Sequence, residues 1–266
     1  MDNQQDHDVT ARTWRRLRAW FHLPAGRLLL EQESAQLESV LPDLFGYYLL
    51  QVGRPGRIDM LAASRIRHSI IMSLESPLRT RGQNHADLCG LADALPFAAE
   101  SLDVIVLPHV LEFVPDPHQV LREVDRALIP EGHLVITGFN PWSLWTLWRW
   151  VGWRRKNPPW SGCFHSSTKV QDWLQLLGFD TLLIRSFVYY PPVQHGALIR
   201  RLRLFEHLGK RFQPFGGAVY ILLAKKRMAT LTPIPPRWRI RDKLLPGRVP
   251  EPTVRSNRSR QDRDTV

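Results

Sequence analysis

The chain has 266 residues, of which 44% are hydrophobic and 23% charged, proportions that are ordinary for a globular protein and exclude a wholly disordered one. Its two cysteines, Cys89 and Cys163, are too few for a disulfide framework and form no CxxC pair, which indicates a reducing compartment. The net charge of +11 is uneven: from Lys225 to Val266 twelve Lys/Arg oppose four Asp/Glu, so a nucleic-acid-binding role would rest on this tail.

The opening residues 1–11 are polar and acidic, unlike a signal peptide. No apolar run reaches the roughly 18 residues needed to span a bilayer. The ten histidines show no HxxxH or His/Cys cluster, so the sequence predicts no metal site. We therefore expect a cytoplasmic protein without a protein-built metal centre.

Two helices are expected at the start. The segment Thr13–His22 places four large apolar side chains at helical spacing among arginines: Trp14, Leu17, Trp20 and Phe21. Such a helix either packs on a sheet edge or over a cleft, or it lies on a membrane surface. Leu28–Leu41 predicts the second helix.

The next part of the chain alternates strands with loops. Tyr47–Val52 predicts a first strand, and the glycine-containing loop Gly53–Gly56 follows it. Ile58–Arg67 is expected to be a short helix, Ser69–Ser73 a second strand and Ala86–Leu91 a third. This alternation favours an α/β fold.

The stretch Leu91–Asn140 predicts a βαβ unit and hence a parallel sheet. Asp103–Leu107 is a β-branched apolar run typical of a strand buried on both faces. Asp116-Pro117 supplies a helix N-cap and a first-turn proline, Pro130–Gly132 ends the helix, and His133–Thr137 starts the next strand. The helix has an apolar face and a polar face: Val120, Leu121, Val124 and Leu128 on the first, Arg122, Glu123, Asp125 and Arg126 on the second.

Six short motifs occur in this stretch in a fixed order: Ala94–Phe97, Asp103–Leu107, Leu111–Phe113, Asp116-Pro117, Leu121–Leu128 and Ile129–Gly132. In order and spacing they resemble the second half of a class I S-adenosylmethionine-dependent methyltransferase of the small-molecule type. The resemblance covers about Leu44–Ala224. It implies a Rossmann-like α/β fold with a seven-stranded, mostly parallel sheet whose last strand is antiparallel. It also implies S-adenosylmethionine as cofactor and methyl transfer to a small or lipid-like acceptor.

The resemblance places the cofactor loop after the first strand, where the family has D-x-G-x-G-x-G. Here Gln51 stands in place of the aspartate and Gly53 is kept, with Gly56 nearby. Pro55 and Arg57 replace the second and third glycines, and proline removes a donor N–H. The departure predicts weak or altered cofactor binding. It also leaves open a non-catalytic binding or scaffold protein of the same fold.

Further cofactor contacts are implied at the ends of the second and third strands. Ser73 or Glu75 stands where the family has an acidic residue that binds the ribose. Asp93, with Ala94 beside it, is the substitute for the aspartate that caps the adenine amino group. A solvated turn aspartate is the alternative interpretation of Asp93.

Leu107, Pro108 and His109 end the fourth predicted strand, at the edge where open α/β sheets bind ligands. The first two complete the implied cofactor site. His109 is a candidate general base or substrate contact, against the alternative of a structural histidine bonded to the backbone. Glu112 lies one helical turn further on and could pair with His109 or with a cationic substrate.

A Trp-rich segment, Leu144–Lys156, follows the fifth strand. Asn140, Trp142 and Trp145 are its candidate substrate or lid residues. Three interpretations are open: a lid over the substrate cleft, an interfacial membrane segment, or a protein contact surface. The segment is too short to span a bilayer.

The remaining elements complete the expected sheet and its appendages: a helix capped by Ser166-Ser167 and ended by Gly178, a strand at Phe179–Val188, a basic helix at Ala197–Phe212 and a closing strand at Ala218–Ala224. We expect an N-terminal helical segment at 1–43 and a methyltransferase-like domain at 44–224, with a Trp-rich insertion at 141–160 and a basic helix at 196–212. Proline and arginine predict a disordered tail at 225–266. Only Trp238 is available there for base stacking, so nucleic-acid binding is the weakest hypothesis.

Overall fold

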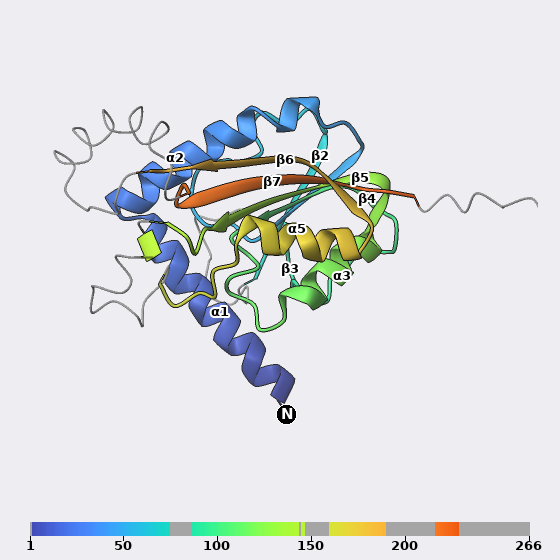
Figure 1. Cartoon of the computed structure of the whole chain (residues 1–266). Coiled ribbons are helices and arrows are strands. Elements are labelled where there is room, and N and C mark those ends of the chain that lie inside the picture. Colours follow the sequence, from blue (N-terminus) through green and yellow to red (C-terminus); the bar gives the residue numbers. More distant parts are fainter. Residues whose placement is uncertain (1, 75–86, 144, 147–159, 190–215, 229–266) are drawn as a thin grey trace, which may run out of the picture. The chain divides into compact units, whose positions relative to one another are not determined.

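In the part of the chain that the structure describes, seven strands form one mixed sheet (Figure 1). The computed structural model describes residues 2–74, 87–143, 145–146, 160–189 and 216–228. The strands are β1 (Tyr48–Val52), β2 (His68–Ser73), β3 (Leu88–Cys89), β4 (Leu102–Pro108), β5 (Leu128–Phe139), β6 (Phe179–Phe187) and β7 (Val219–Lys226). The helices are α1 (Asp2–Phe21), α2 (Pro24–Glu38), the 3-10 helix η1 (Leu41–Asp43), α3 (Pro117–Ala127) and α5 (Ser167–Leu176).

The strand order is β3-β2-β1-β4-β5-β7-β6. Strands β1 to β5 pair in parallel, whereas β7 is antiparallel to both of its neighbours. The predicted fold class is therefore confirmed, including the antiparallel last strand. The chain runs outward from β1 to β3 on one side and from β4 to β5 on the other, so the order of the strands reverses between β1 and β4.

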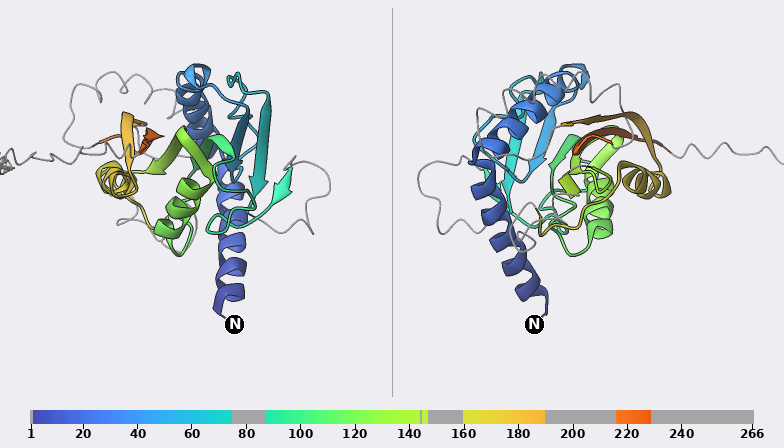
Figure 2. Two further views of the ribbon diagram at one scale, coloured as in Figure 1. Left: turned by 90° about the vertical axis from the view of Figure 1, so that its right-hand side faces the viewer. Right: turned by 60° about the vertical axis from the view of Figure 1, so that its left-hand side comes forward.

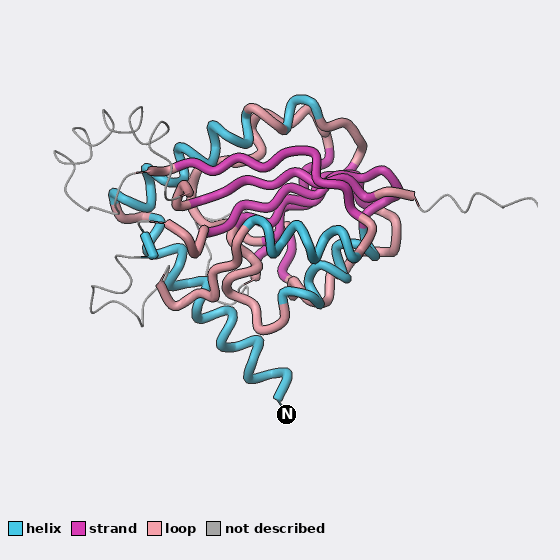
Figure 3. The backbone as a smooth tube through the Cα atoms, viewed as in Figure 1, coloured by secondary structure: helices cyan, strands magenta, loops and turns pink. Residues whose placement is uncertain are grey.

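Helices cover both faces of the sheet (Figure 3). In Figure 1, α3 and α5 lie below the sheet and α2 lies above it. Figure 2 shows that α1 projects away from the sheet towards the N-terminus. The C-terminal half of α1 packs inward, because Trp14, Leu17 and Phe21 are buried in the same core as β1 and β4. Burial of this apolar surface, at about 25 cal/mol per Å², ties the N-terminal helices to the sheet.

The predicted helix signals near the sheet are confirmed in atomic detail. The Asp116 carboxylate accepts hydrogen bonds from the backbone N–H groups of His118 and Gln119, at 2.9 and 3.1 Å, and so caps α3. Ser166 caps α5 in the same way through Lys169 N–H at 3.2 Å. Gly178 ends that helix with a φ of +83°, a left-handed conformation that favours glycine.

One predicted element is wrong. Ile58–Arg67 is not a helix but an irregular segment between β1 and β2 with a turn at residues 60–63. Two short polar side chains satisfy backbone donors locally: Asp59 accepts from Leu61 N–H at 3.0 Å, and Ser64 accepts from Ile66 N–H at 3.2 Å. Such bonds compete with the backbone hydrogen bonds of a helix, and in this segment they form in their place.

Several expectations lie outside the described residues. They concern Glu75, most of the Trp-rich segment, the basic helix 197–212 and the tail beyond residue 228. Among the residues that are described, no helix is long and apolar enough to cross a membrane. Within the same part of the chain, no group of three or more His, Cys, Asp or Glu side chains could hold a metal ion.

Candidate functional site

The loop after β1 is braced by its own side chains. Gln51 is 1% exposed, and its side-chain amide donates to the carbonyl of Gly53 at 2.8 Å. Gly53 has a φ of +79° and donates its N–H to the carbonyl of Met72 in β2 at 2.7 Å. The Arg54 guanidinium donates to the carbonyls of Gly56 and Arg57, both at 3.2 Å. Gln51, which replaces the family's aspartate, therefore serves to hold the turn.

Side chains from the two N-terminal helices press against both glycines of this loop. A Cβ on Gly53 would lie 2.7 Å from the ring of Trp14 in α1. A Cβ on Gly56 would lie 2.1 Å from a methyl group of Leu30 in α2. Neither position has room for a side chain unless these neighbours move. The neighbours that they approach within the described residues are the chain's own helices.

Residues at the ends of β2 and β3 lie along the same edge of the sheet. Ser73 is the last residue of β2, and its carbonyl accepts from Gly90 N–H at 3.1 Å. Asp93 is partly buried in a tight turn closed by a bridge between Leu91 and Ala94. The structure therefore brings Ser73, Asp93 and Ala94 to the carboxyl ends of neighbouring strands.

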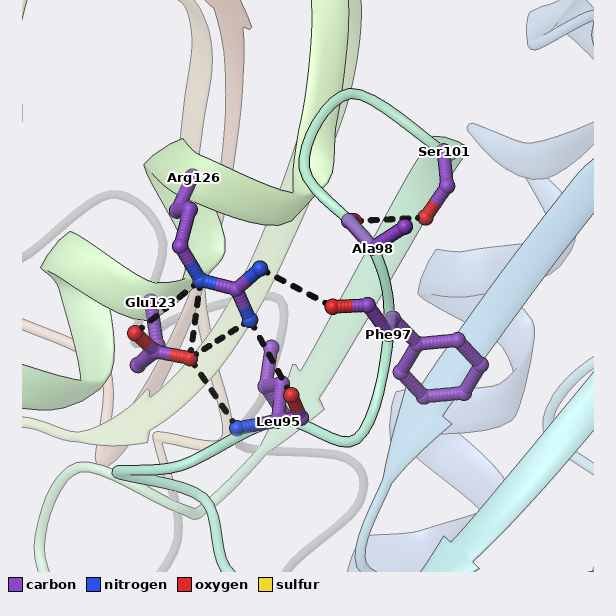
Figure 4. Close-up of polar contacts among 6 residues, drawn as sticks. All are labelled: Leu95, Phe97, Ala98, Ser101, Glu123 and Arg126. Atoms are coloured by element: carbon purple, nitrogen blue, oxygen red, sulfur yellow. Dashed lines mark hydrogen bonds and ion pairs between the residues drawn. The ribbon is translucent and has the colours of Figure 1, made fainter.

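The turn after Ala94 is held by α3 (Figure 4). Glu123 accepts from the N–H of Leu95 at 3.1 Å and forms an ion pair with Arg126 at 2.8 Å. Arg126 in turn donates to the carbonyls of Phe97 at 2.9 Å and Leu95 at 3.0 Å. The hydrogen bond from Arg126, the largest effect, lowers the pKa of Glu123 and keeps it ionised. Glu123 and Arg126, which were predicted on the polar face of this helix, therefore fix the turn after Ala94.

Leu107 and Pro108 are buried at the end of β4, and His109 follows them with a φ of +55°. This conformation is uncommon for a residue with a side chain. It is stabilised by a hydrogen bond from His109 N–H to the carbonyl of Thr137 in β5 at 3.0 Å. The imidazole, fully buried, stacks on the ring of Phe139 at a centroid distance of 4.1 Å.

Both ring nitrogens of His109 meet a carboxylate. Nε2 lies 2.5 Å from Glu33 Oε1 in α2, and Nδ1 lies 3.1 Å from Glu112 Oε1. Burial alone would lower the pKa of His109, but the charge of Glu33 and the hydrogen bonds to both carboxylates outweigh it and raise the pKa to about 10. The same Glu112 oxygen accepts from Phe139 N–H at 2.7 Å. His109 is thus an imidazolium that links α2, the loop after β4 and the end of β5.

Asn140 joins the end of β5 to the start of β7. Its N–H donates to the carbonyl of Ala218 at 2.9 Å, and its side-chain amide donates to the carbonyl of Gly217 at 3.0 Å. Its side-chain oxygen accepts from Trp142 N–H at 3.0 Å. The Trp142 side chain is 75% exposed.

Trp145, in contrast, is 1% exposed inside an aromatic cluster. Its ring lies about 6 Å, centroid to centroid, from three others: Trp20 at 5.9 Å, Phe139 at 6.0 Å and Trp160 at 5.9 Å. The two tryptophans proposed as lid residues therefore lie in different environments. Only Trp145 packs near His109, through their shared neighbour Phe139.

Two contributors to this region were not among the predicted site residues. Glu33 and Trp14 come from helices that precede the first strand, and both are buried against the carboxyl ends of the sheet. A signal for Glu33 was present in the sequence, because the residue falls on the apolar face of α2, four residues from both Leu29 and Leu37. An acidic residue on an apolar face calls for a buried partner.

Comparisons with known proteins agree with this architecture. A family model described as "Methyltransferase domain" matches residues 60–136. The chain is similar to YafS, an uncharacterized protein of Escherichia coli, at 33% identity over 216 residues, which cover 80% of this chain and 82% of the relative.

Solved structures of other proteins share the fold. An S-adenosylmethionine-dependent methyltransferase of Thermotoga maritima, described as a possible histamine N-methyltransferase, superposes with a TM-score of 0.52 at 17% identity, over 73% of this chain and 89% of the other. An S-adenosylmethionine-dependent methyltransferase of Archaeoglobus fulgidus gives a TM-score of 0.52 at 19% identity, over 74% and 94%. At such identities the likeness concerns the fold.

Proposed function

Because this chain belongs to the class I S-adenosylmethionine-dependent methyltransferase family, we propose that it transfers the methyl group of that cofactor to a small-molecule or lipid-like acceptor. The observation that carries the proposal is the position of Gly53. It stands at the reversal of strand order between β1 and β4, where open α/β sheets bind ligands, and its positive φ is a conformation that favours glycine.

S-adenosylmethionine is the cofactor of the family. The residues at the carboxyl edge of the sheet are of types that could bind it. The loop would contribute Gln51, Gly53 and Gly56, and the ends of the strands would contribute the rest of the cofactor site: Ser73, Glu75, Asp93, Ala94, Leu107 and Pro108. Two side-chain donors buried near this edge, the indole N–H of Trp14 and the hydroxyl of Thr137 in β5, have no hydrogen-bond partner in the described part of the chain. Such a donor is expected where a polar ligand binds.

When bound, the cofactor supplies an electrophilic methyl group on a sulfonium. Displacement at that methyl needs chiefly a nucleophile held in line, so the protein contributes mostly by positioning the acceptor and excluding water. We assign these tasks to Glu112, Asn140 and Trp145, which lie at the ends of β4 and β5. The assignment of His109 as a general base becomes a positioning role, because both of its ring nitrogens are bonded to carboxylates. We place the reaction in the cytoplasm.

The proposal is tested by calorimetric titration of the whole chain with S-adenosylhomocysteine. Gly53→Ala should weaken binding by at least about tenfold, because the variant is strained at positive φ and meets the ring of Trp14. Gly178→Ala is the matched control: its φ is also positive, but nothing lies within 4 Å and the residue is remote from the loop. It should lose stability without losing affinity. Equal affinity in all three proteins would remove Gly53 from the site.

A second candidate function has one observation in its favour. The side chains of Trp14 and Leu30 already lie close against Gly53 and Gly56, as they would in a methyltransferase-like protein that serves only as a binding module. Absence of any S-adenosylhomocysteine binding at millimolar concentrations would favour this candidate over the enzyme.

A further inference from the structure

Trp14 lies where the strand order of the sheet reverses. The tip of its indole ring meets Gly53, which follows β1, and its edge faces the ring of Phe113, which follows β4, at a centroid distance of 6.5 Å. One side chain of α1 therefore bridges the carboxyl ends of the two strands that flank the reversal. Ligands of open α/β sheets bind at this place.

The indole carries a polar group that the rest of the described structure leaves unsatisfied. Trp14 is 2% exposed, and within the residues that the structure describes its Nε1–H has no hydrogen-bond partner. A buried donor without an acceptor costs about 1–3 kcal/mol, a cost that phenylalanine or leucine would avoid while filling much of the same space. Most buried donors in native proteins are paired, so this one calls for an acceptor that a ligand can supply.

The indole ring of Trp14 is held in place without a ligand. Gly53 is held by its own N–H bond to Met72 and by the side chain of Gln51, and the ring of Trp14 lies so close that no Cβ could be added between them. The loop beside it contains Pro55, which has no N–H to offer. Trp14 thus adds one fixed donor next to a loop whose sequence has removed one.

We propose that the Nε1–H of Trp14 donates a hydrogen bond to the carboxylate of the amino-acid part of the bound cofactor. An indole N–H only donates, so its partner must be an acceptor. The carboxylate is the anionic acceptor that S-adenosylmethionine and S-adenosylhomocysteine carry, and bonds to charged groups are the stronger ones. This inference rests on the proposed function.

The test compares two ligands with three proteins by titration calorimetry of the whole chain. S-adenosylhomocysteine carries the carboxylate, whereas 5′-methylthioadenosine lacks the amino-acid part. Trp14→Phe should weaken S-adenosylhomocysteine binding by roughly 10- to 100-fold, the equivalent of one bond to a charged group. The same variant should bind 5′-methylthioadenosine within about twofold of the wild type, since a bond that the ligand does not make cannot be lost.

Trp20→Phe is the matched control. Trp20 lies on the same helix and contacts Phe21 and Trp145 rather than the loop. This variant should bind both ligands as the wild type does. A second measurement needs no substitution that weakens folding: in ¹⁵N-labelled wild-type protein, the indole N–H resonance of Trp14 should move downfield with S-adenosylhomocysteine and not with 5′-methylthioadenosine.

Two results would overturn the inference, and they are distinguishable from each other. If the wild type binds S-adenosylhomocysteine and Trp14→Phe binds it equally well, with an unmoved indole resonance, the proposed function stands and the role of Trp14 fails. If the wild type binds neither ligand, the proposed function fails and the inference fails with it.

Discussion

Glu33 in α2 and His109 after β4 meet at 2.5 Å although 76 residues separate them in the chain. The contact places a carboxylate of the N-terminal helices on the imidazole that also binds Glu112. Buried ion pairs of this kind contribute little when intact but are costly to break, because the remaining charge has no water to solvate it. Their main effect here is to fix where α2 sits on the carboxyl edge of the sheet.

Replacing Glu33 by glutamine should therefore destabilise the protein by about 3 kcal/mol, since His109 keeps its charge and loses one counter-ion. Urea unfolding monitored by circular dichroism measures the difference. Glu31→Gln is the control, because Glu31 lies on the same helix and is exposed. Similar losses in the two variants would mean that the Glu33–His109 pair does not hold α2.

The raised pKa of His109 predicts how stability depends on pH. The folded-state value is about 10 and the ordinary value 6.5, so the folded state holds the proton more tightly. The resulting stabilisation is complete below pH 6.5 and is lost as pH rises towards 10. Between these limits the wild type should lose on the order of 4 kcal/mol of unfolding free energy that His109→Gln does not lose. Parallel pH profiles for the two proteins would refute the buried imidazolium.

Arg126→Ala should loosen the turn that α3 holds. The variant loses the ion pair with Glu123 and the bonds to the carbonyls of Leu95 and Phe97, at a cost of about 1–2 kcal/mol. Hydrogen exchange measured by mass spectrometry should accelerate in peptides that cover residues 91–101. Arg122→Ala is the matched control on the same helix: its partner Asp116 is 3.6 Å away and its side chain is 56% exposed. The hydrogen-exchange pattern of Arg122→Ala should match that of the wild type. Indistinguishable patterns in the two variants would mean that Arg126 does not hold the turn.

The two tryptophans after β5 should respond differently to substitution. Trp145→Ala removes a fully buried ring from the aromatic cluster and should cost about 3–5 kcal/mol. Trp142→Ala removes an exposed ring and should change the unfolding free energy by less than about 0.5 kcal/mol. Thermal unfolding of both variants checks this contrast. Comparable losses would show that Trp142 is packed.

The elements that could be predicted from the sequence are those with local signals. The Asp116 cap of α3, the Ser166 cap of α5 and the left-handed Gly178 each act within four residues. The buried strand β4 is recognisable because a run of β-branched residues has few other uses. These signals, with the order of the motifs, were sufficient for the fold class.

The failures have equally physical causes. The helix expected at Ile58–Arg67 does not form, because the side chains of Asp59 and Ser64 accept hydrogen bonds from backbone N–H groups of this segment. The surroundings of His109 could not be foreseen, because a pattern along the chain does not show that Glu33 of α2 contacts the His109 ring. The contact between Trp14 and Gly53 likewise joins elements on either side of α2.

The position of β7 has a consequence for how the chain folds during synthesis. Among the strands that the structure describes, β6 pairs with β7 alone, and β5 has β7 on its second side. Until Val219–Lys226 has left the ribosome, β5 exposes an unpaired edge and β6 has no place in the sheet. Open strand edges are prone to pair with other chains, so a nascent chain or a truncation that stops before β7 should be vulnerable to aggregation. Strand β7, the last of the described strands to be made, therefore pairs with the open edges of β5 and β6 together.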